Sequence, residues 1–232
     1  MVGVTGHRGA AALEPENTIR SVRKALDLGV DQVEIDVHLS KDKKLVVIHD
    51  ERVDRTTNGR GYVRDLTLAE IEKLDAGKGE RIPTLQEVID VVRGKAILQI
   101  ELKGQGVEED TVNTVEENRI VDEVMLTSFR HPAVRIAKEL NPRLKTGVLF
   151  YCHPVRVCQL ALDAGANAIH PNVDFIDRSM VEEAHSLGLE VRVWNSDDEE
   201  QMRRLIALGV DAIGSNRPDL LLRIVRQGET GS

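Results

Sequence analysis

Two pairs of charged residues, each two positions apart, are the first features of this sequence that could carry chemistry. Glu34 and Asp36 stand within the run Val33–Val37, and Glu101 and Lys103 end another apolar run. Residues two apart on a strand point to the same face, so the charged side chains lie opposite the apolar ones. Three converging carboxylates form the oxygen-ligand set that Mg²⁺ or Ca²⁺ prefers. Glu34, Asp36 and Glu101 are therefore predicted to hold a divalent metal ion.

The sequence also contains cations that could neutralise these acids without a metal. Burying several carboxylates is costly unless positive charge compensates them. Internal salt bridges from Arg8 and Lys103 are therefore an alternative to the metal ion, and the sequence leaves it open.

Two histidines are placed where they could serve as proton donors and acceptors. His7 precedes Arg8 after the first apolar run, and His49 follows the run that begins at Leu45. An imidazole titrates near neutral pH, and arginine offers a fork of donors to phosphate. Either histidine alone would more often be a structural loop residue. By contrast, His38 is expected in solvent on a turn, and His170 is expected in a loop rather than in a pocket.

A recurring sequence pattern shows which secondary-structure elements must position these charged residues and histidines. A helix ends at a glycine and a short turn leads into a strand, as at Gly29, Gly165, Gly188 and Gly209. The strands expected are Gly3–Gly6, Gln32–Val37, Ala96–Leu102, Val124–Ser128, Thr146–Phe150, Ala168–His170, Glu190–Trp194 and Ala212–Gly214. The helices expected are Glu16–Leu28, Leu85–Val92, Glu108–Glu117, Pro132–Leu140, Pro154–Ala164, Arg178–Leu187, Glu199–Leu208 and Pro218–Arg226.

This alternation predicts an α/β fold, a (β/α)8 TIM barrel, in which polar residues at the C-terminal ends of the strands line the active site. An open doubly wound sheet is the competing architecture. No Gly-x-Gly-x-x-Gly turn follows the first strand to favour it.

The segment Lys41–Gly94 is too long to be a single crossover connection between two parallel strands. It contains an extra strand over 45–48 and a short helical pattern over 68–74. Loops that follow barrel strands lie over the mouth, so an insertion at roughly 50–84 is predicted to cap the site. The chain is then one barrel domain over 1–232.

The composition of the chain argues against a nucleic-acid-binding protein and against a membrane-spanning one. The 232 residues carry a net charge of −8, which argues against a nucleic-acid partner. No apolar run approaches the roughly 18 residues of a membrane-spanning helix, so stable membrane insertion is not expected. The two cysteines, Cys152 and Cys158, form no disulfide framework, and together with the charged N-terminus they favour a cytoplasmic location.

Several motifs together resemble the glycerophosphodiester phosphodiesterase family in order and spacing across almost the whole chain. The motifs are His7-Arg8-Gly9, Pro15-Glu16-Asn17-Thr18, Glu34-Ile35-Asp36-Val37, Val47-Ile48-His49-Asp50, Arg55-Thr56-Thr57-Asn58-Gly59, Pro83-Thr84-Leu85, Glu101-Leu102-Lys103, Val193-Trp194 and Gly209-Val210-Asp211.

The resemblance implies roles for individual residues. Glu34, Asp36 and Glu101 would bind the metal, and His7 and His49 would be the catalytic pair. The substrate would be bound by Arg8, Lys103 and Trp194. Asn17 matches a family asparagine, although capping of a helix N-terminus explains it nearly as well.

Two positions depart from the family pattern. Asn195 follows the tryptophan where threonine is usual, and Asn216 stands where an acidic residue is common. Both lie near the rim and keep a polar side chain, so they affect the detail of substrate recognition more than the reaction.

The resemblance implies metal-dependent hydrolysis of a small glycerophosphodiester to glycerol 3-phosphate and an alcohol. Acid–base catalysis by the histidines would proceed through a cyclic phosphate. A lysophospholipase D-type phosphodiesterase on the same barrel is one alternative, and a non-catalytic phosphoester-binding protein is another. The polar insertion favours a water-soluble substrate. The choice between Mg²⁺ and Ca²⁺, the head group, the order in which the histidines act and the oligomeric state are not readable from the sequence.

Overall fold

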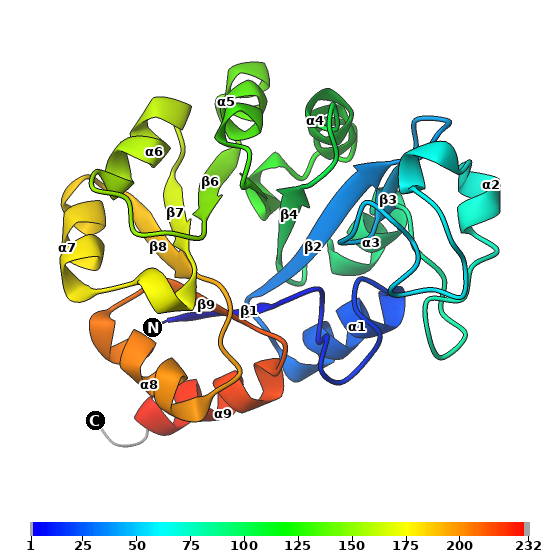
Figure 1. Ribbon diagram of the computed structural model, residues 1–232. Helices are drawn as coiled ribbons and strands as arrows, with labels where there is room; N and C mark the ends of the chain where they lie inside the picture. The colour runs from blue at the N-terminus through cyan, green and yellow to red at the C-terminus, as the bar shows by residue number, and fades with distance from the viewer. Residues whose placement is uncertain (1, 230–232) are drawn as a thin grey trace.

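Eight parallel strands close into a barrel with helices around its outside (Figure 1). The structure is a computed structural model that describes residues 2–229. The barrel strands are β1 (Gly3–Gly6), β2 (Gln32–Leu39), β4 (Ile97–Leu102), β5 (Val124–Ser128), β6 (Lys145–Phe150), β7 (Ala168–Pro171), β8 (Glu190–Val193) and β9 (Ala212–Ser215). β1 pairs with both β9 and β2, so these eight strands form a closed ring, and the doubly wound alternative is excluded.

The helices that cover the barrel follow the expected alternation. They are α1 (Ile19–Leu28), α3 (Leu85–Val92), α4 (Glu108–Glu117), α5 (His131–Leu140), α6 (Val157–Ala164), α7 (Arg178–Ser186), α8 (Glu199–Leu208) and α9 (Pro218–Glu229). Their apolar faces and the outward-facing residues of the strands form one continuous core between the two layers.

Local chemistry explains where these helices begin and end. Gly29, Gly165 and Gly209 adopt left-handed conformations at the ends of α1, α6 and α8, as the recurring sequence pattern predicts. The first helix begins at Ile19, three residues later than expected. Thr18 is its N-cap and accepts a hydrogen bond from the Ser21 amide.

β2 runs two residues further than the sequence suggests because a neighbouring strand extends its ladder. The short strand β3 (Leu45–Val47) pairs with it antiparallel over Val37–Leu39. His38 therefore lies within a strand rather than on an exposed turn.

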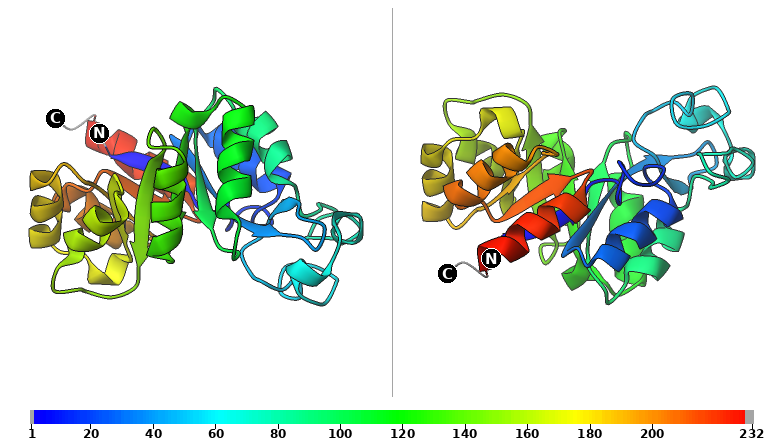
Figure 2. Two further views of the ribbon diagram at one scale, coloured as in Figure 1. Left: turned by 90° about the horizontal axis from the view of Figure 1, so that it is seen from above. Right: turned by 90° about the horizontal axis from the view of Figure 1, so that it is seen from below.

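The expected insertion leaves the barrel after β3 and projects from one side of it, as both views of Figure 2 show. It contains the short helix α2 (Leu68–Ile71) and has its own apolar cluster. The buried members of that cluster are Val46, Ile48, Val53, Val63, Ile71, Ala76 and Ile82. Burial of these side chains holds an otherwise polar segment in place beside the barrel mouth.

Among the described residues, no helix combines the length and the apolar character that crossing a membrane requires.

Candidate active site

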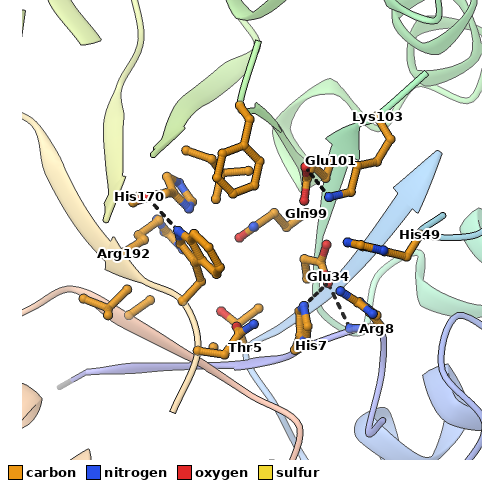
Figure 3. A pocket seen from close by; sticks show the side chains of 17 residues that line it. Thr5, His7, Arg8, Glu34, His49, Gln99, Glu101, Lys103, His170 and Arg192 are labelled. Carbon is orange, nitrogen blue, oxygen red and sulfur yellow. Dashed lines mark hydrogen bonds and ion pairs between the residues drawn. The ribbon is translucent and has the colours of Figure 1, made fainter. Parts of the chain in front are cut away.

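A pocket opens at the end of the barrel where the strands finish, and the side chains that line it come from most of the strands (Figure 3). It encloses about 80 Å³ of free volume, which is room for several water molecules and so for a small polar group. Its lining includes seven of the eight residues that the sequence analysis assigned to the site: His7, Arg8, Glu34, His49, Glu101, Lys103 and Trp194. The eighth, Asp36, is fully buried directly beside it.

The three acids predicted as metal ligands lie together. Asp36 is directly opposite Glu101 in the β2–β4 ladder, and Glu34 lies two residues earlier on the same face of β2. Carboxylate oxygens of all three residues lie within 4.8 Å of one another. Each side chain is buried, so the charges repel one another at short range with little water to screen them.

Burial and mutual repulsion shift the pKa values of these carboxyls. Burial, followed by the charges of Asp36 and Glu101, raises the pKa of Glu34 well above its usual value. Burial and Asp36 raise the pKa of Glu101 to about 7. For Asp36, burial works upward, but Lys103 and Arg8 outweigh it, so its pKa is lowered.

Both proposed counter-cations contact the acids, so the salt-bridge alternative is present in the geometry. The Lys103 ammonium lies 2.9 Å from Glu101 Oε1 and 3.7 Å from Asp36 Oδ1, and Arg8 Nε lies 3.5 Å from Asp36 Oδ2. These contacts do not satisfy the whole cluster. Asp36 Oδ1 is buried and accepts no hydrogen bond. Three carboxylates against two cations, with a buried oxygen that accepts no hydrogen bond, fit a further positive charge such as a divalent metal ion.

Backbone strain at two residues contributes to this arrangement. Arg8 and Asn17 have positive φ angles of 50° and 57°. The Arg8 backbone N–H donates to Glu34 Oε2 at 2.9 Å, and the Asn17 side-chain amide donates to Asp36 Oδ2 at 2.8 Å. Since Thr18 is the helix cap, the capping explanation for Asn17 is wrong, and Asn17 instead positions an acid of the cluster.

The two histidines predicted to be catalytic face the pocket with their Nδ1 atoms occupied. His7 Nδ1 lies 2.7 Å from Asn216 Oδ1, and its Nε2 lies 3.9 Å from Glu34 Oε2. His49 Nδ1 lies 2.6 Å from Asp50 Oδ1. A partner on Nδ1 fixes the tautomer that leaves Nε2 available for proton transfer.

The electrostatic surroundings of His7 keep it neutral. Burial, reinforced by the charge of Arg8, lowers the pKa of His7 to about 4. The ring therefore stays unprotonated at neutral pH and can accept a proton.

Sequence reasoning assigned no role to the ion-pair network behind His49. Arg55 Nε donates to Asp50 Oδ2 at 2.7 Å, and its two terminal nitrogens bridge to Glu16. Glu16 also accepts from Arg8 at 2.9 Å. The network connects the insertion to both the histidine and the arginine of the site, and its members lie in the motifs over 7–9, 15–18, 47–50 and 55–59.

Two histidines lie where the sequence analysis did not expect them. His38 is 9% exposed, and its Nε2 lies 3.1 Å from the His49 carbonyl oxygen, so the solvated position expected for it is wrong. His170 is 2% exposed and lines the pocket instead of lying in a loop. Burial lowers the pKa of His170 well below its usual value.

Two aromatic side chains, Phe129 and Trp194, line the pocket, and Tyr151 packs against Trp194 outside this lining. Trp194 donates from Nε1 to the His170 carbonyl oxygen at 3.0 Å, which fixes its indole. Phe129 packs against Trp194 edge-to-face with ring centroids 5.2 Å apart, and Tyr151 lies 6.0 Å from the same ring. The sequence analysis found Trp194 but not Phe129 or Tyr151, because no motif signals a contact between loops so far apart in the chain.

The two departures from the family pattern fit their surroundings. Asn195 lies against Gly214, where a Cβ atom would come 2.5 Å from the asparagine Oδ1. Asn216 connects His7 to Asp197, since its amide donates to Asp197 Oδ2 at 2.7 Å. The acid expected beside His7 is therefore replaced by Asn216, and the acid Asp197 contacts His7 only through that asparagine.

Together, the closed barrel, the acid cluster with its two cations and the paired histidines define a barrel enzyme of the kind that acts on phosphate esters. The chain belongs to the glycerophosphoryl diester phosphodiesterase family, whose sequence model matches residues 7–220.

Relatives and solved structures agree over nearly the full length. A glycerophosphodiester phosphodiesterase from Caldanaerobacter subterraneus is 42% identical over 97% of this chain and 98% of its own. A phosphodiesterase of Oleispira antarctica, solved with the product sn-glycerol-3-phosphate, has a TM-score of 0.89 and 31% identity over 97% of this chain and 96% of its own. A structure from Galdieria sulphuraria has a TM-score of 0.90 and 28% identity, with 97% and 98% coverage.

Proposed function

We propose that this protein hydrolyses glycerophosphodiesters to glycerol 3-phosphate and an alcohol, and that the reaction depends on a divalent metal ion. The observation that carries the proposal is the buried cluster of three carboxylates, bordered by Arg8 and Lys103 and by two histidines with fixed Nδ1 atoms. The product-bound Oleispira relative supports the choice of substrate class.

Glu34, Asp36 and Glu101 would hold the metal ion, either Mg²⁺ or Ca²⁺. When bound, such an ion supplies Lewis-acid stabilisation of charge on the phosphoryl oxygens. Arg8 and Lys103 supply the remaining positive charge, Arg8 as a fork and Lys103 as a point charge. In this structure both cations contact the acids, and both would turn towards phosphate if substrate and a metal ion were bound.

The histidines would transfer the protons. One Nε2 accepts the proton of the substrate's glycerol 2-hydroxyl as that oxygen bonds to phosphorus, and the other donates a proton to the departing alcohol oxygen. The product of this step is a five-membered cyclic phosphate. In the second step one histidine Nε2 would take a proton from water as the water oxygen bonds to phosphorus. The bond between phosphorus and the glycerol 2-oxygen breaks, and the other histidine returns a proton to that oxygen, which gives glycerol 3-phosphate. Trp194 and Phe129 would pack against the glycerol carbons.

The cyclic route makes a direct prediction about the substrate. Glycerophosphocholine will release choline and glycerol 3-phosphate, whereas an analogue in which hydrogen replaces the glycerol 2-hydroxyl will react at least about 100-fold more slowly, because the internal nucleophile is gone. Phosphorus NMR on the two compounds measures this. Equal rates would replace the cyclic route by direct attack of water, while hydrolysis of glycerophosphocholine would still support the proposed substrate class.

The metal site predicts how metal affinity depends on pH. Because the pKa of Glu101 in the metal-free protein is about 7, a proton competes with the metal at that carboxylate below this pH. We expect the affinity for Mg²⁺ or Ca²⁺ to fall by up to about tenfold between pH 8 and pH 6. Calorimetry in two buffers of different ionisation enthalpy measures both the affinity and the proton released. An affinity that stays constant over this range would contradict the assignment.

One observation favours a second substrate, a lysophospholipid. Phe129, Tyr151 and Val155, in the loops after β5 and β6, are 41%, 61% and 102% exposed. An acyl chain leaving the pocket on this side would cover apolar surface, in contrast to the polar insertion on the other side. The ratio of rates on glycerophosphocholine and lysophosphatidylcholine, with the lipid below its micelle concentration, decides between the two substrates.

A further inference from the structure

A groove lies beside the active-site pocket and shares Lys103 with it. About 440 Å³ of open volume lies between the end of β2, the insertion and the loop that follows β4. Its lining includes His38, Lys41, Lys43, Arg64, Lys103 and Arg130. None of the roles argued above uses this groove.

The groove is positively charged although the chain as a whole is acidic. Five cations line it: Lys41, Lys43, Arg64, Lys103 and Arg130. Glu51 is the single carboxylate among the lining residues, and the chain as a whole carries a net charge of −8. A concave surface with one sign of charge concentrates ligands of the opposite sign.

Three of these cations form no ion pair at 4 Å or less with the described residues, although the charge of Lys41 adds to the Thr67 hydrogen bonds that lower the pKa of Glu70. Lys103 and Arg130 form ion pairs with Glu101 and Glu108 at 2.9 and 3.0 Å. Within residues 2–229, by contrast, no carboxylate oxygen lies within 4 Å of the charged groups of the other three, which are Lys41, Lys43 and Arg64.

Local contacts fix Arg64 and Lys43, two exposed cations of the groove. The Arg64 guanidinium lies 4.7 Å from the centre of the Tyr62 ring, a cation–π contact that leaves its charge unneutralised. Lys43 lies in the tight turn between β2 and β3, with a φ angle of 59° and a backbone hydrogen bond to Ser40 of 3.0 Å. The cations therefore stand on ordered backbone rather than on a loose loop.

The groove begins where the substrate's alcohol would leave the pocket. Lys103 points from β4 into the pocket, near His49 and the acid cluster (Figure 3). His38, which lines the groove, contacts the His49 carbonyl, so the two hollows share a wall. With glycerol carbons against Trp194 and phosphate near Arg8, the alcohol part of a diester would extend towards the insertion and this groove.

We propose that the groove binds a negatively charged group, such as a second phosphate, on the alcohol part of the substrate, with Lys43 and Arg64 as its main contacts. The proposal rests on the glycerophosphodiesterase function and specifies its substrates. Diesters whose alcohol carries an anionic group are then preferred over those whose alcohol is neutral or cationic.

The test compares two substrates that differ only by that group, glycerophosphoinositol and glycerophosphoinositol 4-phosphate. At low ionic strength we expect kcat/KM to be about tenfold higher for the phosphorylated compound, mainly through KM, with the ratio falling as salt is added. The double variant Lys43→Gln/Arg64→Gln will reduce this ratio to about 2 or less. The matched control, Arg23→Gln/Lys24→Gln on α1, changes the net charge equally and will leave the ratio unchanged.

A binding measurement keeps this proposal distinct from the proposed function. Calorimetry of glycerophosphoinositol 4-phosphate with metal-free protein reports affinity without turnover, and the same loss in the groove variant is expected. Turnover of both compounds at equal kcat/KM, with no effect of the groove variant on rate or binding, would overturn this inference and leave the proposed function standing. No turnover of either compound with any metal, but binding that depends on Lys43 and Arg64, would support the groove and overturn the proposed function.

Discussion

Replacing His49 with alanine will lower kcat by about 10²–10⁴-fold, the usual range for the loss of one acid–base group. The ring is partly exposed at the pocket, and its Nδ1 is held by Asp50 at 2.6 Å, so its removal deletes a proton-transfer group and little of the core. His7→Ala is expected to have an effect in the same range. Steady-state rates of glycerol 3-phosphate release from glycerophosphocholine measure both variants.

The control for this experiment is a histidine away from the pocket. His185→Gln on α7 removes a ring that contacts Asp211 at 2.9 Å and will leave kcat within about twofold of wild type. Metal binding by calorimetry must be retained in His49→Ala. A variant with bound metal and near wild-type turnover would show that the histidine in question takes no part in proton transfer.

Replacing Glu34 with glutamine will raise the metal concentration needed for half-maximal activity by about 100-fold or more. Loss of even an outer partner of a metal ligand typically costs about 10–100-fold in affinity, and Glu34 is assigned as a direct ligand. Titration of Mg²⁺ or Ca²⁺ against activity and against heat of binding measures the change.

The same variant will stabilise the metal-free protein. The pKa of Glu34 is raised in the folded state. At pH values above its unfolded pKa of about 4.5, this carboxyl therefore lowers the free energy of unfolding. At pH values well below about 4.5, it has no effect on that free energy. Glutamine removes that cost. The metal-free Tm of Glu34→Gln is therefore expected to exceed that of wild type at pH 7 and to match it near pH 4. A lower Tm at pH 7 would show that Glu34 is an ordinary structural partner of Arg8 instead of a member of a strained ligand set.

The architecture could be predicted from the sequence because each βα unit carries local signals. Glycine at the left-handed end of a helix, followed by an apolar run, marks a strand wherever it occurs, and the bounds of α3, α4 and α8 agree with the expected ranges. The closed barrel then brings residues at the strand ends together. Charged residues two apart on β2 and β4 could thus be placed in one cluster before any coordinates were known.

The parts of the site that the sequence did not predict depend on contacts between distant segments. Asn17 resembles a helix cap in the sequence, but its positive φ angle turns its amide towards Asp36. The extension of β2, and with it the burial of His38, requires pairing with β3. His170 and Phe129 occupy loops or strand ends with ordinary sequence patterns, and only barrel closure directs them into the pocket.

The groove beside the site escaped sequence reasoning for a related reason. Lys41 and Lys43 lie in one turn, Arg64 in the insertion and Arg130 after β5, so the cations come from three separate segments of the chain. Their charges add only when the insertion folds back against β2. A net charge of −8 therefore does not describe the field near the mouth.

The measurement that tests the central claim most directly is glycerol 3-phosphate release from glycerophosphocholine by the wild-type protein, with chelator alone and then with Mg²⁺ or Ca²⁺ in excess. The account predicts no more than background release in chelator and full recovery with at least one of the two ions. Undiminished release in chelator, from protein shown by elemental analysis to be free of metal, would contradict the assignment of Glu34, Asp36 and Glu101 as a catalytic metal site.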